Sequence, residues 1–199
     1  MAQEAPGPAR LEAFSDGVIA VIITVMVLEI KVPHADGLQG VRNLVPSLAI
    51  YLLSFSFTGV YWLNHQHLLH RAQKASHSMQ CANLGFLFCL SLLPLSTAYV
   101  VDKHLSGFAV AVYSASLLTI ALSFLWLRLT VYAHLRRRNA MAEEDRNGLR
   151  NHLFGLFFFA VTIPTAFYYP RSVLLANALF TLTWIFPNLS FAQITQKQE

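Results

Sequence analysis

The sequence predicts an all-α, polytopic membrane protein with six transmembrane helices in a single domain of residues 1–199. Hydrophobic residues make up 55% of the chain and charged residues only 12%, and the mean hydropathy is +0.49, far from the composition of a soluble domain. The apolar residues form runs long enough to cross a bilayer, separated by short polar segments. We therefore expect a protein embedded in a lipid bilayer.

The first helix is predicted from Phe14 to Val32, after a disordered tail of residues 1–9. At 1.5 Å per residue it would span roughly 28 Å, close to the thickness of the hydrocarbon core. Thr24 is its only polar residue at mid-depth, whereas Asp16 and Glu29 lie near its two ends. Ionisable groups at such depths are costly without partners, so we expect this helix to face protein.

Five more helices are predicted from the remaining apolar runs, at about residues 44–70, 81–101, 108–134, 152–169 and 172–192. Pro94 is expected to kink the third helix, and Arg128 near the end of the fourth can snorkel to the interface. The last two helices are joined by a turn at Pro170 and Arg171. Residues 33–42 are predicted as an external loop, 135–151 as a cytoplasmic loop and 193–199 as a polar tail.

Lysine and arginine residues are distributed unevenly between the two sides of this topology. Nine lie on the side of the termini, namely Arg10, Arg71, Lys74, Arg136, Arg137, Arg138, Arg146, Arg150 and Lys197. Four lie on the other side, namely Lys31, Arg42, Lys103 and Arg171. The positive-inside rule therefore predicts a multi-pass protein of the cell membrane with both termini in the cytoplasm. Because these residues lie at helix ends, they do not indicate nucleic-acid binding.

No pattern in the sequence indicates an enzyme. The chain has no Gly-rich phosphate loop, no nucleophile elbow and no paired carboxylates in an apolar run. His65, His67 and His70 form the densest histidine group, but no carboxylate-histidine helix pattern elsewhere completes a metal site. We therefore expect no metal and no cofactor.

The inward face of the first helix cannot be deduced from periodicity, because the helix is apolar all round. If the Thr24 hydroxyl faces a wet axis, then Val21, Val25 and Leu28 share its face. The alternative is a threonine buried between helices that bonds back to the carbonyl of Ala20. The composition alone favours the alternative, since back-bonding satisfies most threonines in membranes.

A second set of polar residues lies near the end of the second helix, at Trp62, Asn64 and His65. That helix returns to the first side, so these residues reach the depth at which Phe14, Ser15 and Asp16 begin the first helix. We expect Arg10 to cap this cluster, and Asp16 to accept a hydrogen bond from Arg10, Asn64, His65 or Trp62. Such a cluster is expected to fix helix packing rather than to perform chemistry.

The motif RxxxFSD, formed by Arg10, Phe14, Ser15 and Asp16, resembles the lysosomal potassium channel family, transmembrane protein 175. The following GVIAVIITVMVLEI and the Trp and Asn-His of the second helix extend the resemblance, which covers all six helices. A single six-helix repeat is similar to the prokaryotic members of the family. The resemblance implies a homotetramer in which four copies of the first helix line a potassium pore.

The resemblance also implies a pore without a separate pore loop and without a TVGYG filter, and this chain contains no TVGYG sequence. The constriction would instead be a ring of apolar side chains. The family's narrow isoleucine or leucine falls on Val21 and its pore threonine on Thr24, with Val25 and Leu28 continuing the face. This favours the pore interpretation of Thr24. Val21 is smaller than the usual residue, so the constriction could be wider or lie at Val25 or Leu28, and Gln66 replaces a frequent second histidine.

Two other functions remain open, a secondary transporter and a proton-permeable channel of the same topology. Transporters usually have broken helices and internal repeats around a polar site at the midplane. In the first helix only Thr24 is polar at that depth. The leading prediction is therefore passive conduction of potassium, with the lipid bilayer and three further copies of the chain as partners.

Overall fold

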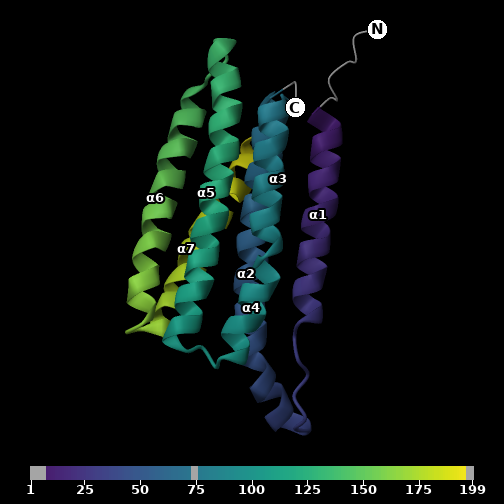
Figure 1. Cartoon of the computed structure of the whole chain (residues 1–199), viewed down its shortest axis with the longest axis vertical. Coiled ribbons are helices and arrows are strands. Elements are labelled where there is room, and N and C mark those ends of the chain that lie inside the picture. Colours follow the sequence, from purple (N-terminus) through teal and green to yellow (C-terminus); the bar gives the residue numbers. More distant parts are fainter. Residues whose placement is uncertain (1–7, 73–75, 196–199) are drawn as a thin grey trace.

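The computed structural model describes residues 8–72 and 76–195, which form helices and their connections and contain no strand. Figure 1 shows the helices side by side as a bundle. Their bounds are α1 Pro8–Leu28, α2 Gly37–Ala72, α3 His77–Ser91, α4 Leu93–Asp102, α5 Gly107–Arg137, α6 Glu143–Ala166 and α7 Pro170–Thr195. Helices α3 and α4 are nearly continuous and together correspond to one predicted transmembrane helix, so the described residues form the six helical segments that the sequence predicts. Of the predicted tails 1–9 and 193–199, residues 1–7 and 196–199 lie outside the described residues, whereas residues 8–9 belong to α1 and residues 193–195 to α7.

Helix α1 begins before the predicted Phe14 and ends at Leu28 rather than Val32. The Ile30 amide donates to the Val27 carbonyl at 3.2 Å, which tightens the last turn. Pro33 disfavours helical backbone at the residue before it, which explains why the helix does not continue.

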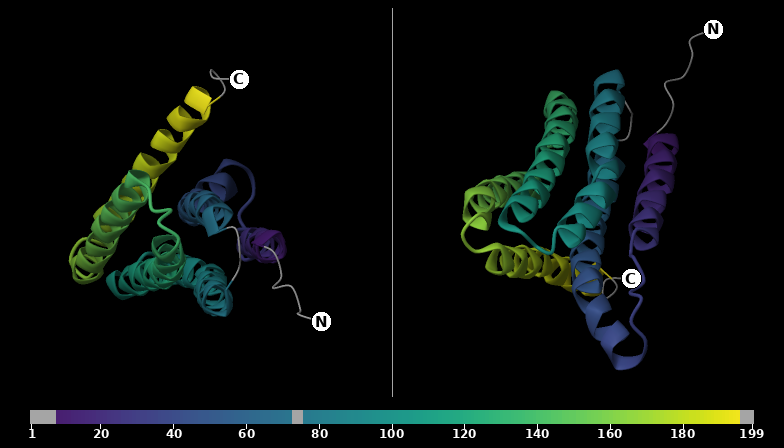
Figure 2. Two further views of the ribbon diagram at one scale, coloured as in Figure 1. Left: turned by 90° about the horizontal axis from the view of Figure 1, so that it is seen from above. Right: turned by 60° about the horizontal axis from the view of Figure 1, so that its bottom comes forward.

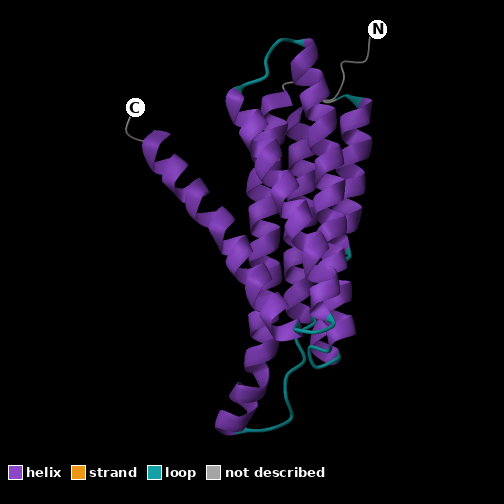
Figure 3. Cartoon of the chain, turned by 90° about the vertical axis from the view of Figure 1, so that its left-hand side faces the viewer, coloured by secondary structure: helices purple, strands orange, loops and turns teal. Residues whose placement is uncertain are grey.

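The predicted loop 33–42 is wrong in its second half, because α2 already begins at Gly37. Gly37 has a φ of +61°, a conformation that glycine adopts without strain, and this allows the chain to turn into the helix. The first part of α2 bends away from the bundle (Figure 3), and Pro46 inside this helix accounts for a bend.

The predicted kink in the third helix is a complete break. Helix α3 ends at Ser91, and Pro94 lies at the second position of α4, where its missing amide costs no helical hydrogen bond. The interior at this level is joined by hydroxyl groups: Ser54 of α2 contacts Thr97 of α4 at 2.8 Å and Tyr113 of α5 at 2.9 Å.

The predicted loop 135–151 is also too long, because α5 continues to Arg137 and α6 begins at Glu143. Three acidic residues occupy the first turn of α6, where they interact favourably with the helix dipole. The Asp145 carboxylate also accepts the Ala142 amide at 2.8 Å, which satisfies one of the free amides at the start of the helix.

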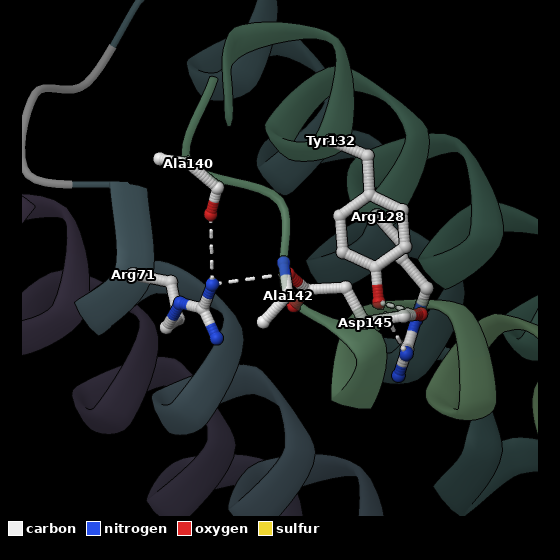
Figure 4. Close-up of polar contacts among 6 residues, drawn as sticks. All are labelled: Arg71, Arg128, Tyr132, Ala140, Ala142 and Asp145. Carbon is white, nitrogen blue, oxygen red and sulfur yellow. Dashed lines mark hydrogen bonds and ion pairs between the residues drawn. The ribbon is translucent and has the colours of Figure 1, made fainter. Parts of the chain in front are cut away.

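The start of α1, the end of α2, the start of α3 and the α5–α6 connection lie at the same end of the bundle (Figure 1). Arg71 at the end of α2 joins two of these by donating to Asp145 at 3.0 Å and to the Ala140 carbonyl at 3.1 Å (Figure 4). At the opposite end, Lys31 and Lys103 contact Asp102 at 2.9 and 3.0 Å. The hydrogen bond from Lys103 to Asp102 raises the pKa of the Lys103 ammonium. Because these ion pairs are exposed, they add little to the stability of the fold.

Arg128 does not snorkel to the surface as predicted, since only 6% of it is exposed. Its Nη1 donates to the Tyr132 hydroxyl at 3.0 Å, and the Tyr132 hydroxyl donates to the Asp145 carbonyl at 2.9 Å (Figure 4). Helix α6 covers the arginine because Gly148 allows close approach: a Cβ at this position would lie 2.7 Å from Nη1.

Four described helical stretches are long and apolar enough to cross a membrane: α1, α2, the combined α3 and α4, and α5. Within the described residues α6 and α7 do not reach this length and hydropathy, although both helices complete the bundle. Helix α5 contacts α2, α3, α4, α6 and α7, whereas α1 lies at the edge of the bundle (Figure 2). Helix α7 leans away from the other helices toward its C-terminal end (Figure 3).

Candidate functional site

Helix α1 has one face against its own subunit and one uncovered face. The packed face consists of Ser15, Ile19, Ile22 and Met26, each at most 4% exposed, and it contacts α2, α3 and α4. Only 22% of the apolar window of α1 is buried, compared with 39% to 50% in the other three spans. A helix at the edge of the bundle therefore presents about half of its circumference to whatever surrounds the subunit.

The four residues predicted to line a pore all lie on the uncovered face. The exposed fractions are 60% for Val21, 37% for Val25 and 81% for Leu28, and Thr24 is exposed as well. Their positions three and four residues apart give one continuous stripe along the helix. The stripe is apolar except for one hydroxyl.

Thr24 combines features of both interpretations of its role. Its hydroxyl donates to a backbone carbonyl one turn earlier, that of Val21 at 2.9 Å rather than that of Ala20. It is not buried between helices of its subunit, however. Because the donated proton points back to the helix, the oxygen keeps acceptor capacity on the uncovered side.

Polar side chains join the first turns of α1 to α2 and α3 on the opposite face. The ring NH of Trp62 donates to the Asp16 carboxylate at 2.8 Å. The Asn83 side chain donates to the Ser15 hydroxyl at 2.9 Å and contacts Nε2 of His65 at 2.7 Å through its oxygen. We refer to Ser15, Asp16, Trp62, His65 and Asn83 as the polar network.

The bonds of the polar network fix the proton on His65. Asn83 uses its NH₂ group toward Ser15, so its oxygen faces His65 and must accept, which makes Nε2 the donor. The Ser15 hydroxyl donates its own hydrogen bond to the Leu11 carbonyl at 2.8 Å. The other ring nitrogen, Nδ1, is buried without a partner among the described residues. Asn83 therefore provides the only hydrogen bond that the His65 ring makes in this part of the chain.

Three residues of the predicted cluster do not take part in the polar network. Arg10 is exposed and makes no hydrogen bond or ion pair within residues 8–72 and 76–195. Asn64 donates to the Val60 carbonyl of its own helix at 2.8 Å. Phe14 is 53% exposed and points away from the subunit.

Asn83 is the residue that the sequence interpretation missed. It lies in a run that was assigned only an apolar role, between Cys81 and Val101, and it is completely buried. An amide in such a run is costly without partners, and this cost is the signal that could have identified it.

The histidines of α2 do not converge on a metal. His65 is buried in the polar network, whereas His67 and His70 are exposed. Nowhere among the described residues do three histidine, cysteine, aspartate or glutamate side chains lie close enough to hold a metal ion.

Known proteins resemble the chain along most of its length. The sequence model of the family described as endosomal/lysosomal potassium channel TMEM175 matches residues 10–94, which include the uncovered stripe of α1 and the polar network. A protein named potassium channel from Chryseobacterium sp. is 35% identical over 179 residues, which are 90% of this chain and 93% of that protein. The chain belongs to the TMEM175 family.

Other members of the TMEM175 family extend the comparison. A protein named potassium channel from Streptomyces collinus is 34% identical, over 89% of this chain and 91% of its own length. The crystal structure of a lysosomal potassium-selective TMEM175 homologue from Chamaesiphon minutus superposes with a TM-score of 0.80 at 26% identity, over 90% of this chain and 97% of that one. The human relative, named endosomal/lysosomal proton channel TMEM175, is 24% identical, and the match spans only 38% of its length.

Proposed function

We propose that this chain forms a potassium-selective cation channel, in which α1 of four identical subunits lines a central pore and ions pass down their gradient. One observation carries the proposal: α1 keeps a continuous stripe uncovered by its own subunit, and the single mid-depth hydroxyl of that helix lies on it. The bacterial relatives named potassium channels support the choice of ion. Conduction of this kind needs no catalytic residue and no cofactor.

The spacing of the uncovered residues supports contact with other copies rather than with lipid alone. Phe14, Gly17, Val21, Thr24 and Leu28 are all exposed and follow one another by three, four, three and four residues. An alternating spacing of three and four residues is typical of the helix face along which identical helices pack around a common axis. A closed ring of identical subunits is the usual way to make such an axis.

In this arrangement the constriction is a set of stacked apolar rings around one hydroxyl ring. Val21, Val25 and Leu28 supply side chains that offer water no hydrogen bonds, so a narrow pore there opens and closes by wetting and dewetting. Thr24 supplies an oxygen that can replace part of the hydration shell of an ion. Potassium is then the permeant ion rather than a bound cofactor.

A proton-permeable channel of the same architecture is the second candidate, favoured by the name of the human relative. Purified protein in planar bilayers under opposed potassium, sodium and proton gradients tests both candidates. We expect a current that reverses close to the potassium equilibrium potential and that needs no coupled ion. Reversal at the proton potential would contradict the potassium assignment, and saturating flux coupled to a second ion would indicate a transporter.

We further propose that both termini lie in the cytoplasm of a cell with this protein in its plasma membrane. The support is the nine basic residues on the side of the termini against four on the other. Reporter domains fused after Lys197, or inserted into the connection 138–142, are expected to be active only as cytoplasmic reporters. A periplasmic or extracellular signal from either fusion would contradict this orientation.

A further inference from the structure

A recess between α5 and α6 lies at the end of the bundle where these helices are connected. It encloses about 570 Å³ and is lined by Leu129, Tyr132, Ala133, Arg136, Arg137, Met141 and Leu149. The recess is open to the outside and lies away from the uncovered face of α1. No step of the proposed conduction uses it.

The recess is positively charged without a compensating partner. Arg136 and Arg137 are exposed, and neither makes a hydrogen bond or ion pair with its side chain in the described part of the chain. No acidic residue lines the recess, and the nearby Asp145 carboxylate is already bound to Arg71 at 3.0 Å. Behind the Tyr132 side chain lies the buried guanidinium of Arg128, whose Nη1 donates to the Tyr132 hydroxyl at 3.0 Å. This guanidinium adds a further positive charge near the recess.

The other lining residues are apolar, and the recess lies at the depth of the membrane surface. Helix α5 has 31 residues, whereas about 20 suffice to cross the hydrocarbon core, so the part after Arg128 extends into the headgroup region. Leu129, Ala133 and Leu149 then lie at the boundary below the two arginines. A soluble anion would gain nothing from the apolar part of this surface. A molecule with an anionic head and an apolar tail matches both the two arginines and the apolar residues beside them.

We propose that this recess binds an anionic phospholipid, whose phosphate is held by Arg136 and Arg137 and whose acyl chain lies along Leu129, Ala133 and Leu149. Arginine forms bidentate hydrogen bonds with phosphate oxygens, and basic pockets between helix ends bind anionic headgroups in this way. The bound lipid would pack between α5 and α6 at the end where Arg71, Tyr132 and Asp145 connect the helices.

Native mass spectrometry of the full-length protein, titrated with phosphatidylglycerol or phosphatidylcholine in non-ionic detergent, tests the proposal. We expect the wild type to bind phosphatidylglycerol and to discriminate against phosphatidylcholine. The double variant Arg136→Gln/Arg137→Gln is expected to bind phosphatidylglycerol about thirtyfold more weakly, from about a fivefold loss for each basic residue at a membrane surface. Arg136→Lys/Arg137→Lys keeps the charge but loses the bidentate geometry, so its affinity should lie between those of the wild type and the glutamine variant.

The matched control is Arg146→Gln/Arg150→Gln, which removes the same charge from exposed positions on α6 outside the recess. We expect its phosphatidylglycerol affinity to stay within about twofold of the wild type, and both double variants to keep the wild-type melting temperature. Equal losses in both double variants, or equal binding of the two lipids, would overturn the proposal. Displacement of the lipid by millimolar inorganic phosphate would also overturn it, because it would identify a site for free anions.

Discussion

Val21→Ser and Leu28→Asn are expected to raise the single-channel conductance severalfold and to weaken discrimination against sodium. Both residues lie on the uncovered face of α1, with 60% and 81% of their surface exposed. In the proposed ring of four subunits they would surround a narrow axis with side chains that cannot bond to water, so ions would meet a barely wet step. A hydroxyl or amide in each subunit supplies hydrogen bonds and lowers that barrier. Single-channel recording in mixed potassium and sodium measures both effects.

Thr24→Val in the same recordings separates wetting from ion coordination. The substitution keeps the volume and removes the hydroxyl that bonds to the Val21 carbonyl at 2.9 Å. Its acceptor oxygen is lost from the pore, so we expect selectivity for potassium over sodium to fall without a gain in conductance. An unchanged reversal potential would contradict a role for this oxygen in selection.

Ile23→Ser is the matched control for Val21→Ser. Ile23 is also an apolar residue of α1, but it is half-buried, and two residues after Val21 it lies about 160° away around the helix. If Ile23→Ser changes permeation as strongly as Val21→Ser does, the pore face assigned to α1 is wrong.

The sequence predicts the number and approximate course of the helices because long apolar runs have few alternatives in a bilayer. It predicts their ends less well. Glu143, Glu144 and Asp145 look like a loop by hydropathy, yet acidic residues are favoured at the start of a helix, and α6 begins with them. The charge of Arg128 suggested a position at the interface, whereas Gly148 allows α6 to cover it. The contact between these helices could not be deduced from either segment alone.

Which face of α1 packs against its own subunit also could not be deduced from the sequence alone. An all-round apolar helix carries no periodicity, so only Thr24 indicated a phase, and the packed face through Ile19, Ile22 and Met26 had no distinguishing pattern. The polar residues of α1 and α2 indicated that these helices meet. Trp62 and Asp16 do bond to each other, but Ser15 and His65 bond to Asn83 of α3. Asn83 lies 68 residues from Ser15 along the chain, and nothing local to either residue indicates the pairing.

Asn83→Ala is expected to lower the melting temperature of the detergent-solubilised protein by several degrees, and Trp62→Phe by a similar amount. Asn83 provides the only hydrogen bond of the buried His65 ring among the described residues, so the substitution leaves both ring nitrogens without partners. Hydrogen bonds between membrane helices contribute about 1–2 kcal/mol in model peptides. Trp62→Phe keeps an aromatic ring but removes the indole NH that donates to the Asp16 carboxylate at 2.8 Å, an interaction of about 1.5–3 kcal/mol for a charged acceptor.

Two controls distinguish loss of the polar network from loss of any amide or indole. Asn64→Ala removes an amide that bonds only within its own helix, to the Val60 carbonyl, and Trp126→Phe alters a ring that is 51% exposed. We expect both to melt within about a degree of the wild type, since neither joins α1 to its neighbours. Because the polar network lies opposite the uncovered stripe, it also sets the rotation of α1, so Trp62→Phe should alter conductance while Trp126→Phe should not. Equal melting temperatures for Asn83→Ala and Asn64→Ala would show that α1 is held by apolar packing alone.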